Sequence, residues 1–335
     1  MLETIANKGN ARIEIDGDPV QILAPPNKLQ RFEGVAFSPS GDVLSVATAD
    51  TKTVYLFRRN ANGLLEDTPY CDIGGPESGL SYPHDVAFTR WGDTELLAVG
   101  QRGGAIALYE KNQANGNYGP EPAFEIRGSK TKLDYSDGVA FVPPHDEYIA
   151  ACNLEHCSIT FYRRDMGSAV GFELEPALEI DHLSLVHPDG LAFSPCGRWL
   201  AVANHGNHTV SIFQGRKRNN PGEKLEYGPA PVTIIEDPGL RHPHSVAFTP
   251  ETYHLVVTPA GANYFCVYEP ARHKYGLQWS QSPVLQITFG PDDIFKEVNV
   301  NTQEGGPKGI AIHSSSLAIC SPESGVKIYS FHERV

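Results

Sequence analysis

Six titratable side chains recur along the chain at near-equal spacing. Each directly precedes a short apolar run, as in the segments 33–37 (EGVAF) and 189–193 (DGLAF). The six are Glu33, His84, Asp137, Asp189, His244 and Lys308, separated by 51, 53, 52, 55 and 64 residues. Core packing does not select titratable residues at every repeat, and neither does turn chemistry, which prefers Gly, Asn or Ser. The pattern therefore predicts one site assembled from six parts of the chain.

The chemistry of this set depends on how its charge is balanced. Three carboxylates and one ammonium give it a net charge of −2 when the histidines are neutral, and like charges that converge need a counter-charge. Glu33, Asp137 and Asp189 would supply oxygen ligands for Ca²⁺, Mg²⁺ or Mn²⁺, whereas coordination by His84 or His244 would favour Zn²⁺, Mn²⁺ or Fe²⁺. Such a divalent cation could polarise a carbonyl or activate water. The alternative is that these residues bridge neighbouring repeats by ion pairs.

The same residues suggest acid–base roles for a reaction on a small polar molecule. Asp137 or Asp189 would orient or activate water, and His84, His244 or His205 would shuttle the proton. The expected ligands of the substrate are Arg102, Asn153, Asn204 and Lys308. His187 and His242 stand two residues before members of the set, so we expect them at its outer rim.

The elements that must position these residues are short strands. In each repeat the apolar run is followed by a turn, a second apolar run such as 200–203, and an alternating run such as 210–213. A Pro-led run such as 176–180 ends the repeat. Runs of this length, bounded by Gly, Pro and Asn, are typical of strands.

Four strands in each of six repeats predict an all-β fold, a six-bladed β-propeller. We expect one domain over residues 1–335, with blades starting near 32, 83, 136, 188, 243 and 307. The sixth repeat ends after its third strand, and residues 18–26 resemble the missing fourth. Pairing the two ends would remove an exposed sheet edge. A sandwich or open array would explain neither the spacing nor the split repeat.

The connection into the sixth repeat is unusually long. In a propeller, the loop before the inner strand and the turn between the second and third strands emerge on the same face. The loop Gly290–Pro307 would then lie beside the titratable set, as a lid over the channel mouth or as a disordered insertion.

Composition excludes several functional classes. The net charge of −13 and the lack of a basic stripe argue against nucleic-acid binding. No apolar run reaches the length of a membrane span, and residues 1–18 lack a signal-peptide core. Six cysteines without CxxC spacing are typical of reduced thiols. These features predict a cytoplasmic protein, and a closed ring needs no partner subunit, so we expect a monomer.

The repeats resemble those of lactonase-type propellers with YVTN-like repeats, most clearly in residues 187–204 (HPDGLAFSPCGRWLAVAN). A narrower resemblance is to the gluconolactonase and regucalcin-like six-bladed family, which holds a divalent metal in its channel. Phe32-Glu33-Gly34, Asp137-Gly138 and Asp189-Gly190 resemble its ligand motifs, so the resemblance implies Glu33, Asp137 and Asp189 as metal ligands. The proline and tryptophan that follow the first motif in that family are absent here.

Three functions are compatible with these features. The first is a lactonase-like or esterase-like hydrolase with a channel-bound cation, acting on a small polar substrate. The second is a non-catalytic propeller that binds a protein or a small molecule on the same face, because fold alone does not decide function. The third is a lyase or isomerase, which needs an acid and a base but no nucleophile.

Overall fold

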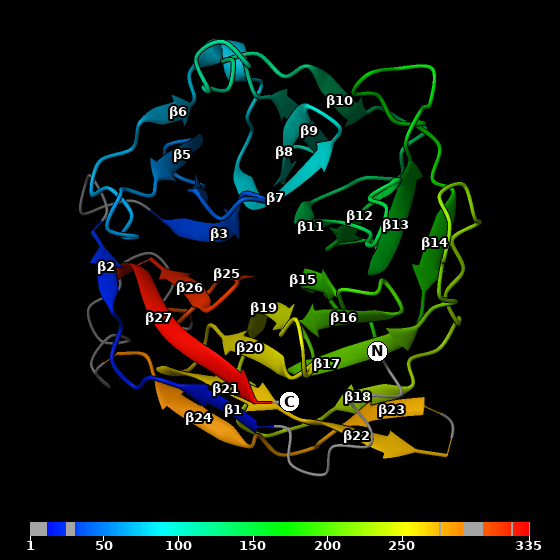
Figure 1. Cartoon of the computed structure of the whole chain (residues 1–335). Helices are drawn as coiled ribbons and strands as arrows, with labels where there is room; N and C mark the ends of the chain where they lie inside the picture. The colour runs from blue at the N-terminus through cyan, green and yellow to red at the C-terminus, as the bar shows by residue number, and fades with distance from the viewer. Residues whose placement is uncertain (1–11, 25–30, 275, 291–303, 323, 335) are drawn as a thin grey trace.

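The computed structural model describes residues 12–24, 31–274, 276–290, 304–322 and 324–334. Six antiparallel blades surround a central channel, and in the first five the first strand along the chain is innermost (Figure 1). The fold is therefore the predicted six-bladed β-propeller. The described residues include one short 3₁₀ helix, η1 (Pro76–Ser78), and no helix among them is long and apolar enough to cross a membrane.

The strands of the first three blades follow the chain from the centre outward. The first blade is β3 (Phe32–Phe37), β4 (Val43–Thr48), β5 (Thr53–Arg58) and β6 (Cys71–Ile73). The second is β7 (Pro83–Trp91), β8 (Thr94–Gln101), β9 (Ala105–Glu110) and β10 (Phe124–Arg127). The third is β11 (Ser136–Phe141), β12 (Tyr148–Asn153), β13 (Ser158–Arg163) and β14 (Leu178–Asp181).

The next two blades keep this order, with one insertion. The fourth blade is β15 (Pro188–Phe193), β16 (Trp199–Asn204), β17 (Thr209–Gln214) and β18 (Thr233–Ile235). The fifth is β19 (Pro243–Phe248), β20 (Leu255–Pro259), β21 (Tyr264–Tyr268) and β24 (Leu285–Thr288). A hairpin of β22 (Pro270–His273) and β23 (Gly276–Trp279) is inserted in the sequence between β21 and β24, which pair directly with each other, and the repeat pattern did not predict it.

The sixth blade joins the two ends of the chain, as the split repeat predicted. Its strands β25 (Ile310–His313), β26 (Ser316–Ser321) and β27 (Gly325–Arg334) come from the C-terminal part. β2 (Gln21–Leu23) pairs with the first half of β27, and β1 (Arg12–Ile15), which was not predicted, pairs with its second half. The long β27 is therefore covered along both halves by N-terminal residues.

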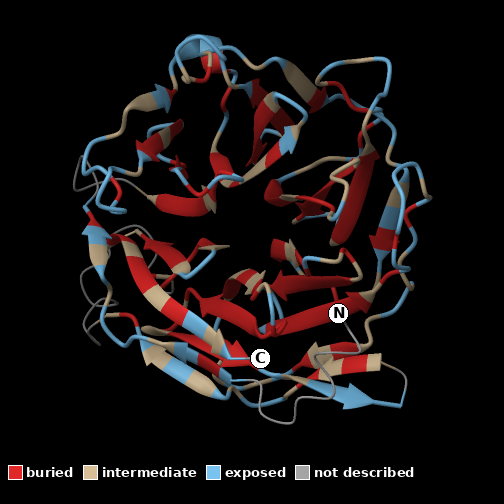
Figure 2. Cartoon of the chain, viewed as in Figure 1, coloured by how far each residue is buried: buried red, intermediate tan, exposed pale blue. Residues whose placement is uncertain are grey.

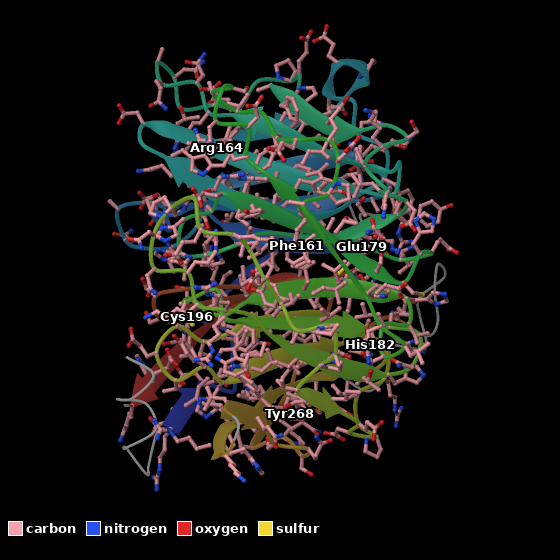
Figure 3. All side chains as sticks on the ribbon, turned by 90° about the vertical axis from the view of Figure 1, so that its right-hand side faces the viewer. Phe161, Arg164, Glu179, His182, Cys196 and Tyr268 are labelled. Carbon is pink, nitrogen blue, oxygen red and sulfur yellow. The ribbon has the colours of Figure 1, made fainter. Side chains whose placement is uncertain are left out.

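The hydrophobic core is divided into six clusters, one between each pair of adjacent blades. Val35 and Phe37 of β3, for example, pack with Ala318 and Ile328 of the sixth blade. Buried residues dominate the inner strands and exposed ones the rim (Figure 2). In the side view, Phe161 and Tyr268 belong to two of these clusters (Figure 3). Alternation along the inner strands buries large apolar residues, such as Val35 and Phe37, between the blades.

A β-bulge marks the start of the inner strand in the first five blades. In the first blade the pairing steps from Phe32↔Thr48 to Val35↔Val46, so Glu33 and Gly34 lie opposite one partner residue. The same irregularity occurs at the start of β7, β11, β15 and β19. Bulges re-aim side chains, and here each one lies at the position of a titratable residue.

The glycines of these bulges are required by close approach between blades. A Cβ on Gly190 would lie 2.4 Å from the carbonyl oxygen of His244, and one on Gly34 would lie 2.6 Å from the Cα of Asp85. Both distances are shorter than van der Waals contact. The Gly at this position therefore lets the inner strands converge tightly at one end of the channel.

Candidate functional site

The six titratable side chains converge at the narrow end of the channel, as their spacing predicted. All six are almost completely buried: Glu33, His84, Asp137, Asp189, His244 and Lys308. Five of them, all but Lys308, line a cavity of about 10 Å³. A volume of this size holds about one water molecule. A substrate would therefore meet this set, the channel ring, from outside rather than enter it.

Glu33 is the most heavily paired member of the channel ring. Lys308 Nζ donates a hydrogen bond to its Oε2 at 2.7 Å, and His244 Nε2 lies 3.1 Å from the same oxygen. Arg31 contacts its Oε1. Burial would raise the pKa of Glu33, but Lys308, His244, His84 and Arg31 together hold it well below its usual value. Glu33 is therefore a fixed anion that links the first, fifth and sixth blades.

Asp137 is paired in a similar way, by an arginine of the neighbouring blade. Arg102, in the turn after β8, donates from Nε to Oδ1 at 2.8 Å and from Nη2 to Oδ2 at 2.7 Å. This fork is the bidentate geometry that makes arginine–carboxylate pairs strong. Both oxygens of Asp137 are therefore committed, which leaves it poorly placed to activate water.

Asp189 is the channel-ring carboxylate that no described lysine or arginine pairs with. Its neighbours are imidazoles: His84 Nδ1 lies 3.7 Å and His244 Nε2 3.8 Å from Oδ1, and His205 Nδ1 lies 3.6 Å from Oδ2. Oδ1 is buried without a hydrogen-bond partner among the described residues. Burial raises the pKa of Asp189 well above its usual value, and the nearby Asp137 carboxylate adds to this.

The two histidines of the channel ring are neutral at ordinary pH. Their rings stack with centroids 5.0 Å apart. Burial lowers the pKa of His84 well below its usual value, with Arg102 adding to the shift. Burial and then Lys308 lower the pKa of His244 to about 4. The countercharge to the carboxylates therefore comes from Lys308, Arg31 and Arg102 rather than from imidazolium.

A second layer of side chains lies between the channel ring and solvent. Arg102, His205, Arg31 and Glu304 have side chains that are 28, 20, 15 and 14% exposed. Glu304 accepts from Lys308 Nζ at 3.3 Å through Oε2, and His205 Nε2 lies 3.3 Å from its Oε1. These four residues, the outer layer, are what a ligand at the channel mouth would touch.

Two expected substrate ligands lie elsewhere. Asn153 and Asn204 are fully buried, and their amides donate to hydroxyl groups within their own blades, such as Thr160 Oγ1 and Ser211 Oγ. They brace the strands and do not reach the mouth. Lys308 is 1% exposed and bonded to Glu33 and Glu304. Of the four expected ligands, the structure leaves Arg102 accessible.

The expected divalent cation meets a donor set different from the predicted one. Among the described residues, two groups bring three donor atoms within 4.8 Å of one another: Glu33 with His84 and His244, and His84 with Asp137 and Asp189. These groups could hold a metal ion, but Glu33, Asp137 and Asp189 do not form such a group together. Lys308 and Arg102 already pair with two of these carboxylates. The channel ring therefore does not fit a Ca²⁺ or Mg²⁺ ion held by those three residues.

Sequence reasoning missed three residues that the structure places at the site. Arg31 stands two residues before Glu33, the same offset that drew attention to His187 and His242, so that rule would have found it. Asp85 directly follows a channel-ring residue, at the position where most repeats have glycine, and burial raises its pKa to about 7. Glu304 lies in the long connection, where no repeat signal exists. The expected lid, Gly290–Pro307, lies largely outside the described residues.

Comparisons with known proteins agree with the fold. The family model described as "Lactonase, 7-bladed beta-propeller" matches residues 181–293. The comparison with curated proteins found no match. A crystal structure of a putative 6-phosphogluconolactonase from Bacteroides uniformis has a TM-score of 0.59 at 16% identity, over 93% of this chain and 83% of that one. The Cps50 (Swd1) β-propeller domain of Myceliophteria thermophila has a TM-score of 0.57 at 14% identity, over 95% and 99%.

These two structures share the fold, and the family match covers one part of the chain. The matched family is described as seven-bladed, whereas this chain forms six blades. The match begins in β14 and ends just after β24, so it contains the residues that supply Asp189, His205 and His244 to the site. The resemblance of this chain to lactonase-type propellers is thus confirmed, although this chain forms six blades rather than seven.

Proposed function

We propose that this protein is a lactonase-like or esterase-like hydrolase in which Asp189 activates water. The observation that carries the proposal is the unequal pairing of the carboxylates in the channel ring. Glu33 and Asp137 are paired with lysine or arginine, whereas Asp189 has no such partner among the described residues and keeps a buried oxygen, Oδ1, without a hydrogen bond to them. That oxygen belongs to a residue lining a cavity with room for about one water.

The chemistry follows from the neighbours of Asp189. Its raised pKa makes it a stronger base than an exposed carboxylate. The attacking water forms a bond to the carbonyl carbon and gives its proton to Asp189. As the ring-opening or ester C–O bond breaks, His205 passes the proton from Asp189 to the leaving alkoxide; His205 Nδ1 lies 3.6 Å from Asp189 Oδ2, and its side chain is the more exposed of the two. The carboxylic acid and the alcohol are released, as one hydroxy acid when the substrate is a lactone, and no oxidant or reductant is consumed.

The residues of the outer layer favour a substrate that carries a negative charge. Nε and Nη2 of Arg102 are bound to Asp137, but its Nη1 makes no hydrogen bond to the described residues. A guanidinium edge at the mouth can bind a carboxylate or phosphate, or stabilise the developing oxyanion. We therefore propose a small polar lactone or ester that carries an anionic group.

A non-catalytic binding propeller is the second candidate. The pairs Glu33–Lys308 and Asp137–Arg102 each join different blades, as a purely structural network would. Such a network leaves Asp189 unexplained, because this buried carboxylate has no lysine or arginine partner among the described residues, and a buried charge without a partner costs stability.

The test is a panel of small esters and lactones, with and without a carboxylate or phosphate, followed by acid release at constant pH. We expect turnover, with preference for the anionic members. Arg102→Lys keeps the charge but loses the fork, so we expect KM for anionic members to rise at least about tenfold. Arg127→Lys, at an exposed arginine on β10, is the matched control. No hydrolysis of any member above the buffer rate would support the binding propeller instead.

A further inference from the structure

The channel has a second, larger cavity at the end opposite the mouth. Its volume is about 370 Å³, which lies within the range of small-molecule sites. The later residues of all six inner strands and the loop after β11 form its walls. Each inner strand contributes one alanine: Ala36, Ala87, Ala140, Ala192, Ala247 and Ala311. We call this space, whose small apolar side chains keep it open, the far cavity.

The far cavity carries negative charge without a positive side chain in its lining. Asp85 and Asp146 line it, and no lysine, arginine or histidine of the described residues does. Both aspartates are partly exposed although they lie within the ring of blades. A cation with an apolar body would therefore find both of its parts matched there.

Asp85 forms the floor of the far cavity. It lines this cavity and also the small one at the channel ring, so it separates the two. The backbone N–H of Val139 donates to its Oδ2 at 3.1 Å, and the N–H of Val86 also donates to the carboxylate. A carboxylate accepts about four hydrogen bonds. Because Asp137 is its charged neighbour and no described lysine or arginine pairs with it, Asp85 has room for an ammonium group.

The second carboxylate is placed at a fixed distance along β7. Asp85, Ala87 and Thr89 alternate along this strand, so they lie on the same face of it. Thr89 Oγ1 donates to Asp146 Oδ2 at 2.8 Å. At roughly 3.3 Å per residue, the two carboxylates lie about 13 Å apart along the strand direction. The methyl group of Ala87 stands between them.

The positive charge nearby is committed to other acceptors. Arg218 contributes to the electrostatic surroundings of Asp146. Its Nη1 lies 3.3 Å from Glu147 Oε2, and its Nη2 donates to the carbonyl oxygen of Val142 at 3.1 Å. Arg218 therefore leaves Asp146 without a direct ion pair among the described residues.

We propose that the far cavity binds a linear diamine or polyamine, with one ammonium group on Asp85, a second on Asp146 and the hydrocarbon chain along the channel alanines. Charge-assisted hydrogen bonds from ammonium to carboxylate supply direction, and the methylene groups are removed from water by the alanine walls. This site is at the other end of the channel from the proposed hydrolytic site and does not depend on it.

The test is a calorimetric titration of the full chain with diaminodecane, diaminobutane and decylamine. We expect one diaminodecane per chain, bound at least about tenfold more tightly than the other two amines. The reason is that the short diamine cannot reach both carboxylates, and the monoamine pairs with one of them. Equal affinities for the three amines would overturn the proposal.

Variants of the two carboxylates assign the site. Asp85→Asn keeps an acceptor for the N–H of Val139 but removes the charge, so it should weaken diaminodecane binding at least about tenfold. Asp146→Asn should reduce the affinity for diaminodecane to that for decylamine. Asp72→Asn, at an exposed carboxylate on β6, is the matched control and should bind like wild type. Melting curves should show that each variant is folded.

Three results would contradict this assignment. Wild-type protein that binds none of the amines would overturn it, and so would Asp85→Asn that binds diaminodecane as tightly as wild type. Loss of binding in Asp189→Asn with retention in Asp85→Asn would place the amine at the mouth instead. None of these readouts requires turnover, so failure of the proposed hydrolase would leave the test intact.

Discussion

At the scale of single residues, the site is defined by which charges are satisfied. Lys308, Arg31 and Arg102 neutralise two of the three carboxylates, and burial keeps the histidines neutral. The third carboxylate, Asp189, is left among imidazoles. Residues in equivalent places of the repeats thus differ in their pairing, and this asymmetry supports an anchoring role for Glu33 and the reactive role that we propose for Asp189.

Replacing Lys308 should show how much the stability of the fold with Glu33 buried depends on this lysine. Lys308→Met leaves a buried carboxylate with less compensation, which costs about 3–5 kcal/mol of unfolding free energy. The double variant Glu33→Gln/Lys308→Met removes both charges and should recover a large part of that loss. Urea unfolding measures both. Equal stability of the single variant and wild type would show that the pair contributes nothing.

The lowered pKa of His244 predicts a pH-dependent stability. Its folded pKa of about 4 lies below the unfolded value of 6.5, so the unfolded chain binds the proton more readily between these two pH values. Stability is therefore lost as pH falls below about 6.5. In His244→Gln this loss disappears, and the stability difference from wild type should shift by about 2 kcal/mol between pH 7 and pH 5. Parallel pH profiles for the two proteins would contradict this account.

At the scale of elements, the bulge at the start of the inner strand in the first five blades positions the titratable side chain. It places two residues opposite one, so the titratable side chain occupies the channel while the next residue packs against the neighbouring blade. The repeat in the sequence revealed the strands and the ring of titratable residues because both recur with every blade. The bulge recurs as well, but it is a property of pairing register and leaves no signature of its own in composition.

The role of the bulge glycine can be tested by adding one methyl group. In Gly190→Ala the new Cβ would lie 2.4 Å from the His244 carbonyl oxygen, which should cost about 1–3 kcal/mol through overpacking. Gly17→Ala is the control, because no atom of the described residues lies within 4 Å of the place its new methyl group would take. Thermal or urea unfolding compares the two. Equal effects of both substitutions would argue against close approach as the reason for Gly190.

At the scale of the whole molecule, closure of the ring holds the site together, because Glu33, His244 and Lys308 come from blades that meet only when the ring is closed. β27 is paired on its outer side by β1 and β2. The sequence predicted the closure and the membership of the channel ring. It could not predict the contacts of Glu304, because this residue belongs to a connection without a repeat. The burial of Asn153 and Asn204 was also hidden, since a place at the end of a strand does not show which way an amide points.

Deletion of residues 1–24 should therefore weaken the molecule far from the deleted segment. It removes β1 and β2 and leaves β27 as an open edge. We expect the melting temperature to fall by roughly 5–10 °C, as a loss of a few kcal/mol implies, and amide exchange in β27 to increase. An unchanged melting temperature would show that the N-terminal strands do not contribute to closure.

The most direct test of the account is hydrolysis by Asp189→Asn, compared with wild type and with Asp181→Asn. The first change keeps the side-chain volume and removes the proposed base, while the second alters an exposed carboxylate at the end of β14 in the third blade. On a lactone or ester that wild type turns over, we predict at least about a 100-fold loss of kcat for Asp189→Asn. Asp181→Asn should retain full activity, and both variants should melt as folded proteins. Undiminished turnover by Asp189→Asn would contradict the central claim that this carboxylate activates water.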